Sequence, residues 1–274
     1  MSIQAYYDRN VEREWERLER HRTEFAVTLR ALRQYLPPPP VAILDVGGGP
    51  GRYAIALAAA GYRVTLTDLS AANLALAAEK AQAAGVTLTQ ILPVNALDLS
   101  PLGAPGGAAV YDSVLLLGPL YHLLTAVERQ QAVAEARRVL KPNGILFAAF
   151  ITRFAPFRDI AQGYPDWILE NREYIEQVLQ TGVHDQAIGF TNAYFAHPDE
   201  IIPFMEAAGF ATLALIGCEG VVAGHEENVN ALQGEAWELW VDLNYRLGQD
   251  PALRGAADHL LHVGRNHAEQ DRKN

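Results

Sequence analysis

A glycine-rich segment around residue 45 carries the residue types best suited to hold a ligand. Asp45 ends a short apolar run, and glycines follow it at alternate positions, Gly47, Gly49 and Gly51. Glycines let the backbone take left-handed angles and approach a ligand closely. The spacing does not fit the G-x-G-x-x-G pattern of dinucleotide binding, because the third glycine position holds Arg52. A carboxylate at this turn suits a ligand with a nearby positive charge better than it suits a pyrophosphate.

A second acid, Asp68, comes 17 residues after Gly51 at the end of the apolar run RVTLTD. An acid at this place can bind both hydroxyls of a ribose. The two acids and the glycine turn therefore predict a site for a cationic nucleoside, and S-adenosylmethionine (SAM) is such a ligand. In the alternative interpretations, Asp45 only caps the following turn and Asp68 only caps the next helix.

The motifs ILDVGGGPG, TLTDLS, VNALDL, YDSVLLLGPLYHLL and RVLKPNGILF occur in this order and resemble those of the class I SAM-dependent methyltransferases over about residues 41–150. The resemblance extends loosely to the last two expected strands. It implies that Asp45 and the three glycines hold the methionine end of SAM, that Asp68 binds the ribose, and that Leu69 packs on the adenine. Asn95, followed by Ala96, stands where the family usually has an acid that contacts the adenine amino group. Asn95 keeps an acceptor oxygen, although it is also an ordinary turn residue.

The segment Gly118-Pro119-Leu120-Tyr121-His122-Leu123 follows the expected fourth strand, at the sheet edge where ligands bind. The resemblance implies that Leu117 and Gly118 place backbone beside the cofactor. It points to the small-molecule branch, because methyltransferases of nucleic-acid amino groups have Asn/Asp-Pro-Pro-Tyr/Phe here. We expect Tyr121 and His122 to orient the acceptor or take its proton, since histidine titrates near neutrality. The alternative is a structural histidine and a packing tyrosine.

Tyr7 fits the habit of the family in which an N-terminal helix closes over the cofactor, although a plain hydrophobic staple is also consistent with it. The pairs His21-x-x-Glu24 and His225-Glu226-Glu227 contain metal-ligand residue types, but their spacing alone is weak evidence. We expect them on solvated helix or loop faces and expect no metal. The one cysteine, Cys218, excludes both an intrachain disulfide and a metal site made of cysteines alone.

Composition sets the broad class of the chain. The 274 residues are 50% hydrophobic and 20% charged, as in a globular protein, and the charged N-terminus has no apolar signal region. No apolar run is long enough for a membrane span, so we expect a cytoplasmic protein. The net charge is −10, and residues 151–274 carry 8 Lys/Arg against 19 Asp/Glu. This acidic half disfavours nucleic acid. It indicates either plain solubility or a neutral or cationic partner, and the sequence does not indicate an oligomeric state.

The elements that must position these residues alternate between strand and helix patterns. We expect N-terminal cap helices in residues 1–36, with one or two amphipathic helices over about residues 9–36 that end at Pro37–Pro40. Residues 37–153 then read as a SAM-binding core with strands at 41–46, 63–68, 86–94, 113–118 and 145–151, helices between them, and a KPNG turn before the fifth strand. Alternation of this kind predicts βαβ units and a parallel sheet.

The remaining segments complete the core and cover it. Residues 154–198 are expected to form a cap insertion with helices near 157–180 and an extended piece near 190–196. Residues 199–220 supply a core helix and the sixth strand, 221–257 a helical lid with helices at 228–247 and 251–258, and 258–274 the last strand and tail. The expected fold is α/β, with a seven-stranded Rossmann-like doubly wound sheet whose last strand is antiparallel, plus a helical cap or lid.

The resemblance implies an enzyme that moves a methyl group by in-line displacement to O, N, S or C of a small molecule and leaves S-adenosylhomocysteine (SAH). The alternatives are a tRNA or protein methyltransferase, an inactive SAM- or SAH-binding protein, and a nicotinamide oxidoreductase. The acidic C-terminal half disfavours the first of these. The intact glycine turn and Asp68 disfavour the second, and Gly51 with Arg52 disfavours the third.

Overall fold

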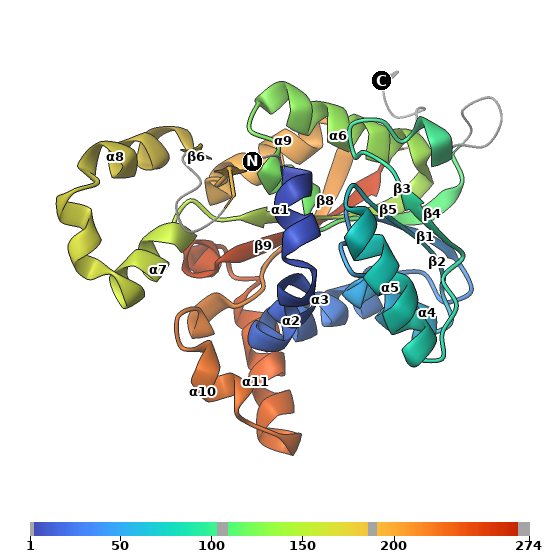
Figure 1. Ribbon diagram of the computed structural model, residues 1–274, viewed down its shortest axis with the longest axis horizontal. Helices are drawn as coiled ribbons and strands as arrows, with labels where there is room; N and C mark the ends of the chain where they lie inside the picture. Colours follow the sequence, from blue (N-terminus) through green and yellow to red (C-terminus); the bar gives the residue numbers. More distant parts are fainter. Residues whose placement is uncertain (1–2, 103–108, 186–190, 268–274) are drawn as a thin grey trace.

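The computed structural model describes residues 3–102, 109–185 and 191–267, and a seven-stranded sheet forms its centre (Figure 1). The strand order is β3-β2-β1-β4-β5-β9-β8. β1 to β5 pair in parallel, whereas β9 is antiparallel to both β5 and β8. The predicted doubly wound fold with an antiparallel last strand is confirmed. The strands are β1 (Ala42–Val46), β2 (Arg63–Asp68), β3 (Gln90–Pro93), β4 (Tyr111–Leu116), β5 (Leu140–Ile151), β8 (Phe210–Gly217) and β9 (His259–Asn266).

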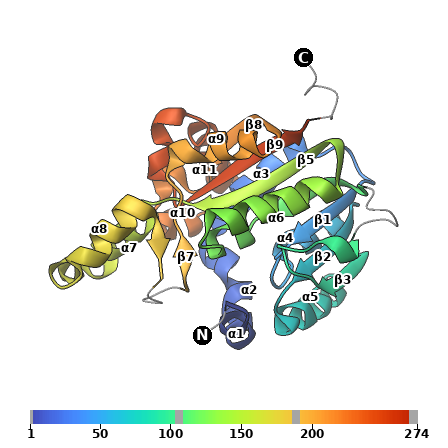
Figure 2. The ribbon, with the colours of Figure 1, turned by 90° about the horizontal axis from the view of Figure 1, so that it is seen from above.

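Helices cover both faces of this sheet, as Figures 1 and 2 show. One face packs against α3 (Arg22–Tyr35), α4 (Arg52–Ala59), α5 (Ala71–Ala83) and α11 (Gly234–Leu247). The other face packs against α6 (Ala126–Val139) and α9 (Pro198–Ala207). Successive strand residues alternate between the two cores, because side chains of a strand point to opposite faces. In β1, for example, Ile43 belongs to the first core and Leu44 to the second.

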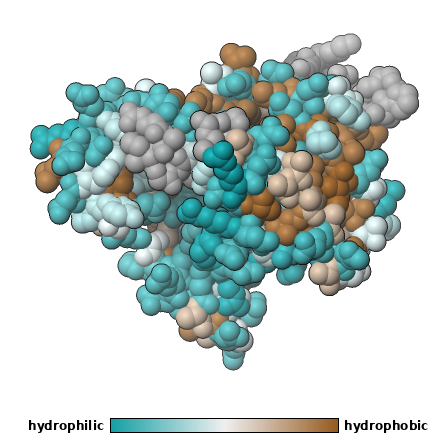
Figure 3. All heavy atoms as spheres, in the orientation of Figure 1, coloured by the Kyte–Doolittle hydropathy of each residue, from teal (hydrophilic) through white to brown (hydrophobic). Residues whose placement is uncertain are grey.

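Three N-terminal helices precede the sheet: α1 (Ile3–Arg9), α2 (Val11–Arg20) and α3. The one or two helices expected over about residues 9–36 are present as α2 and α3. The chain leaves helical geometry at Asn10 and at His21, where ψ is 58°. Arg52, at the start of α4, ties α2 to the core, since its guanidinium stacks on Trp15 at 3.9 Å and bonds the Trp15 carbonyl. The outer surface of α1 and α2 is hydrophilic, and apolar surface lies beside it toward α5 (Figure 3).

The segment after β5 projects from the sheet as α7 (Ala155–Gly163), η3 (Pro165–Leu169) and α8 (Arg172–Thr181) (Figure 2). The helices expected near 157–180 are therefore present as α7 and α8, with η3 between them starting at Pro165. A short antiparallel pair, β6 (Val183–His184) and β7 (Ala193–Tyr194), follows it. β7 falls within the extended piece expected near 190–196, whose residue 190 lies outside the described residues, whereas β6 was not predicted.

The later segment carries η4 (Gly220–Val222), α10 (Glu226–Asn230), α11 and η5 (Pro251–Ala256). The predicted helix at 228–247 is wrong in detail, because the chain interrupts it between α10 and α11. The predicted KPNG turn lies inside β5 as an irregularity, where Asn143 has φ of 62° and the register with β4 shifts. The third strand is shorter than predicted. Short helices η1 (Ser100–Leu102) and η2 (Pro119–His122) complete the described elements. No helix in the described ranges is long and apolar enough to cross a membrane.

Candidate active site

A cavity at the carboxyl edge of the parallel strands gathers the predicted site residues. Every one of them except Gly51 lines it, from the strand ends and from the N-terminal helices. They are Tyr7, Asp45, Gly47, Gly49, Asp68, Leu69, Asn95, Ala96, Leu117, Gly118, Tyr121 and His122. Gly51 lies just below the turn, with φ of 82°, and is the first residue before α4. Its part is to start the helix rather than to face the cavity.

The turn after β1 has little room for side chains. Gly47 has φ of 63°, and a Cβ added there would lie 2.6 Å from the Pro119 ring. A Cβ on Gly48 would lie 2.5 Å from a carboxylate oxygen of Asp45. The backbone of the turn is thus pressed against the strand ends, with its path fixed by glycine. This close approach is what a ligand lying on the backbone requires.

Asp45 is 1% exposed, and neither of its carboxylate oxygens has a hydrogen-bond partner in the described part of the chain. The Ala54 N–H in the first turn of α4 still favours the ionised carboxylate, so capping stays an alternative role for Asp45. Burial, and then the negative charge of Asp68, raise the pKa of Asp45 to about 7. A buried acceptor without a donor is costly unless a ligand satisfies it. The site therefore fits a ligand that brings a cationic donor to Asp45.

Asp68 holds the other side of the turn. One carboxylate oxygen accepts the Gly49 N–H at 2.8 Å, and the other accepts the Ser70 N–H at 2.8 Å. Ser70, not Asp68, caps α5, because its hydroxyl accepts the Asn73 N–H. Burial raises the pKa of Asp68. Each oxygen keeps a second lone pair, so Asp68 can still accept from two hydroxyls of a ligand.

The residues expected around the adenine lie at the ends of β2 to β4. Leu69 is 45% exposed and lines the cavity, so it offers an apolar surface to a ligand. Asn95 accepts the Leu97 N–H at 2.9 Å through its side-chain oxygen, as an ordinary turn residue does. At Gly118, an added Cβ would lie 2.9 Å from the Gly47 carbonyl oxygen. The end of β4 therefore approaches the glycine turn as expected.

Tyr7 and His122 meet across the cavity. The Tyr7 hydroxyl lies 2.7 Å from His122 Nε2, and the other ring nitrogen lies 3.2 Å from the Thr191 hydroxyl. Burial lowers the pKa of His122 to about 4, so the ring is neutral near pH 7. Both ring nitrogens already have protein partners, which suits holding α1 against the core better than taking a proton. Tyr121 is buried on the cavity wall, and burial raises its pKa.

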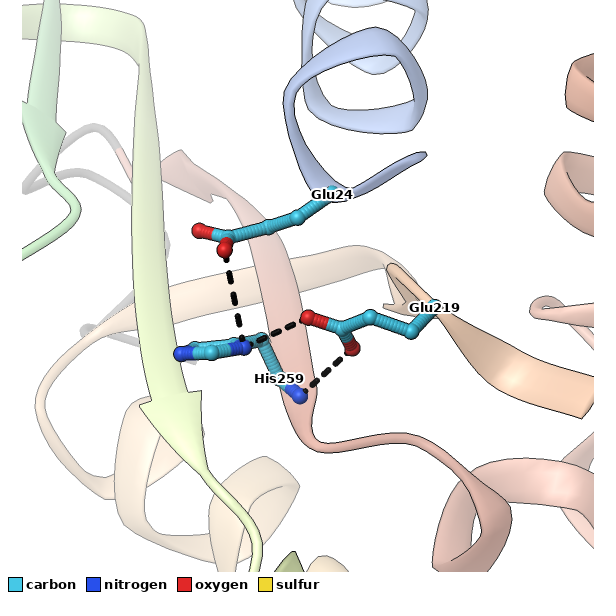
Figure 4. Close-up of side chains that lie close together, drawn as sticks. All are labelled: Glu24, Glu219 and His259. Carbon is cyan, nitrogen blue, oxygen red and sulfur yellow. Dashed lines mark hydrogen bonds and ion pairs between the residues drawn. The ribbon is translucent and has the colours of Figure 1, made fainter. Parts of the chain in front are cut away.

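A charged cluster that the sequence analysis did not predict lies in the same region: Glu24, Glu219 and His259 (Figure 4). His259 Nδ1 lies 2.5 Å from Glu219 and 3.8 Å from Glu24. Arg17 binds both oxygens of Glu24, at 2.7 and 3.1 Å. Burial alone would raise the pKa of Glu24 and lower that of His259. The opposite charges outweigh it, so that Arg17 and His259 bring the pKa of Glu24 to about 2, and the two glutamates bring that of His259 to about 9.

The expectation that Glu24 lies on a solvated face is wrong. Its side chain turns into the protein to meet Arg17, and it lines the cavity. His21 Nδ1 instead lies 2.7 Å from a carboxylate oxygen of Glu226. The motif His21-x-x-Glu24 therefore contacts the motif His225-Glu226-Glu227 through His21 and Glu226. Glu24, Glu219 and His259 could also ligate a metal ion, but both oxygens of Glu24 are already bonded to Arg17.

Comparisons with known proteins agree with this geometry. Residues 43–144 match a family model described as a methyltransferase domain. A ubiquinone biosynthesis O-methyltransferase of Methylocella silvestris is 28% identical over 208 residues, which cover 75% of this chain and 68% of that protein. A SAM-dependent methyltransferase structure from Methanosarcina mazei aligns with a TM-score of 0.56 and 17% identity over 87% of this chain and 98% of that chain. An N-methyltransferase from Bradyrhizobium japonicum in complex with SAH aligns with a TM-score of 0.53 and 15% identity, over 95% and 98% of the two chains.

The sheet order and the acids at the ends of β1 and β2 define the fold as the Rossmann-like one of class I methyltransferases. The family match falls on this core and includes the glycine turn. Residues 43–144 thus carry a methyltransferase domain, on a fold shared with SAM-dependent methyltransferases.

Proposed function

We propose that this protein transfers the methyl group of SAM to an oxygen atom of a small-molecule acceptor by in-line displacement. The observation that carries the proposal is the buried, unpartnered carboxylate of Asp45 beside a glycine turn in the cavity. SAM has an α-ammonium group that Asp45 would bind, and ribose hydroxyls that Asp68 would accept. Leu69 and Ala96 would pack on the adenine.

When bound, SAM supplies a methyl group on a positively charged sulfur. The part of this chain is to bind, align and exclude water. Positioning of this kind can lower a barrier by about 7–11 kcal/mol in favourable models. Tyr7 bonds His122, and Asp8 accepts the Ser70 hydroxyl at 2.6 Å, so α1 lies over the cavity and shields it from solvent.

The covered cavity supports a small acceptor over tRNA or protein. Ile3, Gln4 and Tyr7 of α1 line the cavity, so a large acceptor would have to displace this helix. The Methylocella relative named an O-methyltransferase supports oxygen as the attacking atom. An inactive SAM-binding protein is the second candidate, but the intact turn and the acids of β1 and β2 give no sign of a degenerate site.

Isothermal titration with SAM and SAH tests the proposal on the wild type, on Asp68→Ala and on a control, Asp98→Ala. Asp98 is an exposed acid outside the cavity. Asp68 makes charge-assisted hydrogen bonds worth about 1.5–3 kcal/mol, so the Asp68 variant should bind roughly 10- to 100-fold more weakly. The control should bind like the wild type. Absence of wild-type binding at about millimolar ligand would contradict the proposal.

A further inference from the structure

The Glu24–Glu219–His259 cluster lies at the same edge of the sheet as the glycine turn. It lies beside β8 and β9, whereas the glycine turn follows β1. β8 and β5 run in one direction, and β9 runs against them. Glu219 follows the end of β8 and His259 starts β9, so both reach the edge where β1 and β2 also end. The cavity is continuous across this edge, because Asp45, Tyr121, Ala149 and His259 all line it. The cluster is therefore placed for the acceptor rather than for the cofactor.

The imidazole of His259 is held in one orientation. Its Nδ1–H donates to one oxygen of Glu219 at 2.5 Å. The other oxygen of Glu219 accepts the backbone N–H groups of His259 and Asp258, at 2.8 and 3.2 Å. Glu219 is itself 1% exposed, so this carboxylate cannot turn away. The hydrogen bond fixes the tautomer and leaves Nε2 as the free acid–base atom.

The Nε2 atom points away from both glutamates (Figure 4). No hydrogen bond to it is found within residues 3–102, 109–185 and 191–267, and the residue lines the cavity. A general-base histidine typically has one ring nitrogen oriented by a carboxylate and the other directed to the bound substrate. His259 has this arrangement, with Nδ1 on Glu219 and Nε2 without a protein partner in the described residues. His122 lacks this arrangement, because both of its nitrogens are engaged by the protein.

We propose that Nε2 of His259 takes the proton of the acceptor hydroxyl during methyl transfer, and that the acceptor is a phenol-class hydroxyl. This inference rests on the proposed function. The acceptor O–H bond breaks as its proton moves to Nε2. The oxygen then forms the O–C bond while the C–S bond breaks, and the electron pair of that bond stays on sulfur as the thioether of SAH. The imidazolium afterwards returns its proton to water, which restores the base.

The charges around His259 suit this acceptor class. Glu24 faces it from α3, Glu219 from the end of β8 and Asp258 from the residue before β9; Asp159 of α7 also acts on it. Arg17 of α2 opposes these acids through its pairing with Glu24. The result is a pKa of His259 of about 9, close to the phenol value of about 10. Proton transfer between such groups is nearly balanced, which favours a phenol over the more weakly acidic aliphatic hydroxyl, and a carboxylic acid needs no base.

The test compares two phenols on His259→Gln, Glu219→Gln and a control, His262→Gln. His262 lies on the same strand and is fully buried, but it faces the other side of the sheet and bonds Thr212. One acceptor is catechol, a weakly acidic phenol, and the other is 4-nitrophenol, which ionises readily in water. At a pH of about 8, His259→Gln should lose roughly 10²–10⁴-fold in SAH release with catechol. The loss with 4-nitrophenol should be small, because this acceptor needs no base.

Three further results support or overturn the inference. SAM affinity should be unchanged in His259→Gln, which separates this proposal from the proposed function, and Glu219→Gln should lower the rate with catechol in the same direction. In the wild type, kcat/KM for catechol should rise with pH through the pKa of His259 of about 9 and then level off, because the ionised phenol needs no base; this profile needs no variant.

If His259→Gln lost SAH release equally with both phenols, His259 would not be the base and would have a structural role only. A wild-type rate that needs a divalent cation and vanishes with EDTA would instead make the cluster a metal site. SAM binding without turnover of either phenol would overturn the inference while the proposed function stands. Absence of SAM binding would refute the proposed function itself.

Discussion

The pH dependence of cofactor affinity follows from the buried carboxylate of Asp45. In the free protein the pKa of Asp45 is about 7, so near neutrality about half of the molecules carry a proton on this group. The α-ammonium group of SAM or SAH binds only the ionised carboxylate and keeps it ionised in the complex. Binding is therefore linked to the loss of this proton, and affinity should increase as pH rises toward 7.

The size of the effect follows from the ionised fraction. With a pKa of about 7, this fraction rises from about one eleventh at pH 6 to about one half at pH 7. The dissociation constant of SAH should fall about fivefold over this interval, which corresponds to about 1 kcal/mol. Asp45→Asn should bind SAH more weakly and lose this dependence on pH. Asp98→Asn, an exposed acid outside the cavity, should keep both the affinity and the slope.

Isothermal titration between pH 6 and about 7.5 measures both quantities, because the ammonium group of the ligand stays largely charged in this range. Repeating the titration in buffers of different ionisation enthalpy counts the protons released, which should be close to one per SAH at pH 6 and about half at pH 7. A wild-type affinity that does not change with pH, or an equal slope in Asp45→Asn, would refute the assignment of Asp45 to the ammonium group.

The same carboxylate also affects the free protein. A raised pKa means that the folded state favours protonated Asp45, so its contribution to stability is complete below the ordinary aspartate range and is lost as pH rises through about 7. Above this pH, unfolding without ligand should therefore occur at a higher temperature in Asp45→Asn than in the wild type. An amide with an unfilled hydrogen bond costs less to bury than an ionised acid.

Two further changes test the cap and the glycine turn. Tyr7→Phe removes a hydrogen bond worth about 1 kcal/mol, so SAH should dissociate about fivefold faster in stopped-flow measurements. Tyr6→Phe, next to it on α1, is the control and should have little effect. Equal dissociation rates in the wild type and Tyr7→Phe would show that this bond does not hold the cap. In Gly47→Ala the new Cβ would meet the Pro119 ring at a residue of positive φ, so the variant should lose about 2–4 kcal/mol of unfolding free energy. Gly85→Ala is the control and should lose about 1 kcal/mol, because φ is 68° there but no atom lies within 4 Å. Equal losses of unfolding free energy in the two variants, measured by thermal unfolding, would contradict the crowding at Gly47.

Sequence reasoning could place the residues expected to hold the cofactor at one edge of the sheet, because their signals are local. Asp45 and the glycines lie within one strand and turn, and Asp68 ends the strand that pairs beside it. Each of these residues can be placed once its strand is recognised, because parallel strands end at one edge. The helix breaks at Asn10 and His21 could not be placed this way, since they depend on packing against the core rather than on spacing.

The Glu24–Glu219–His259 cluster, which we propose as the acceptor half of the site, could not be predicted from spacing. Glu24, Glu219 and His259 come from three distant segments, and His259 reaches the edge only because β9 lies between β5 and β8. A histidine at the start of a strand and a glutamate after another carry no local signal of pairing. For the same reason Glu24 was expected in solvent, because the helix pattern alone does not show that Arg17 on the preceding helix draws it inward.

The N-terminal helices connect the two halves. α1 contacts the cofactor half, where Tyr7 bonds His122 and Asp8 bonds Ser70. α2 and α3 contact the acceptor half through Arg17 and Glu24, which set the charge next to His259. The N-terminal helices therefore contact both the glycine-turn side of the cavity and the charges beside His259, so in the proposed reaction they would cover the place of proton transfer.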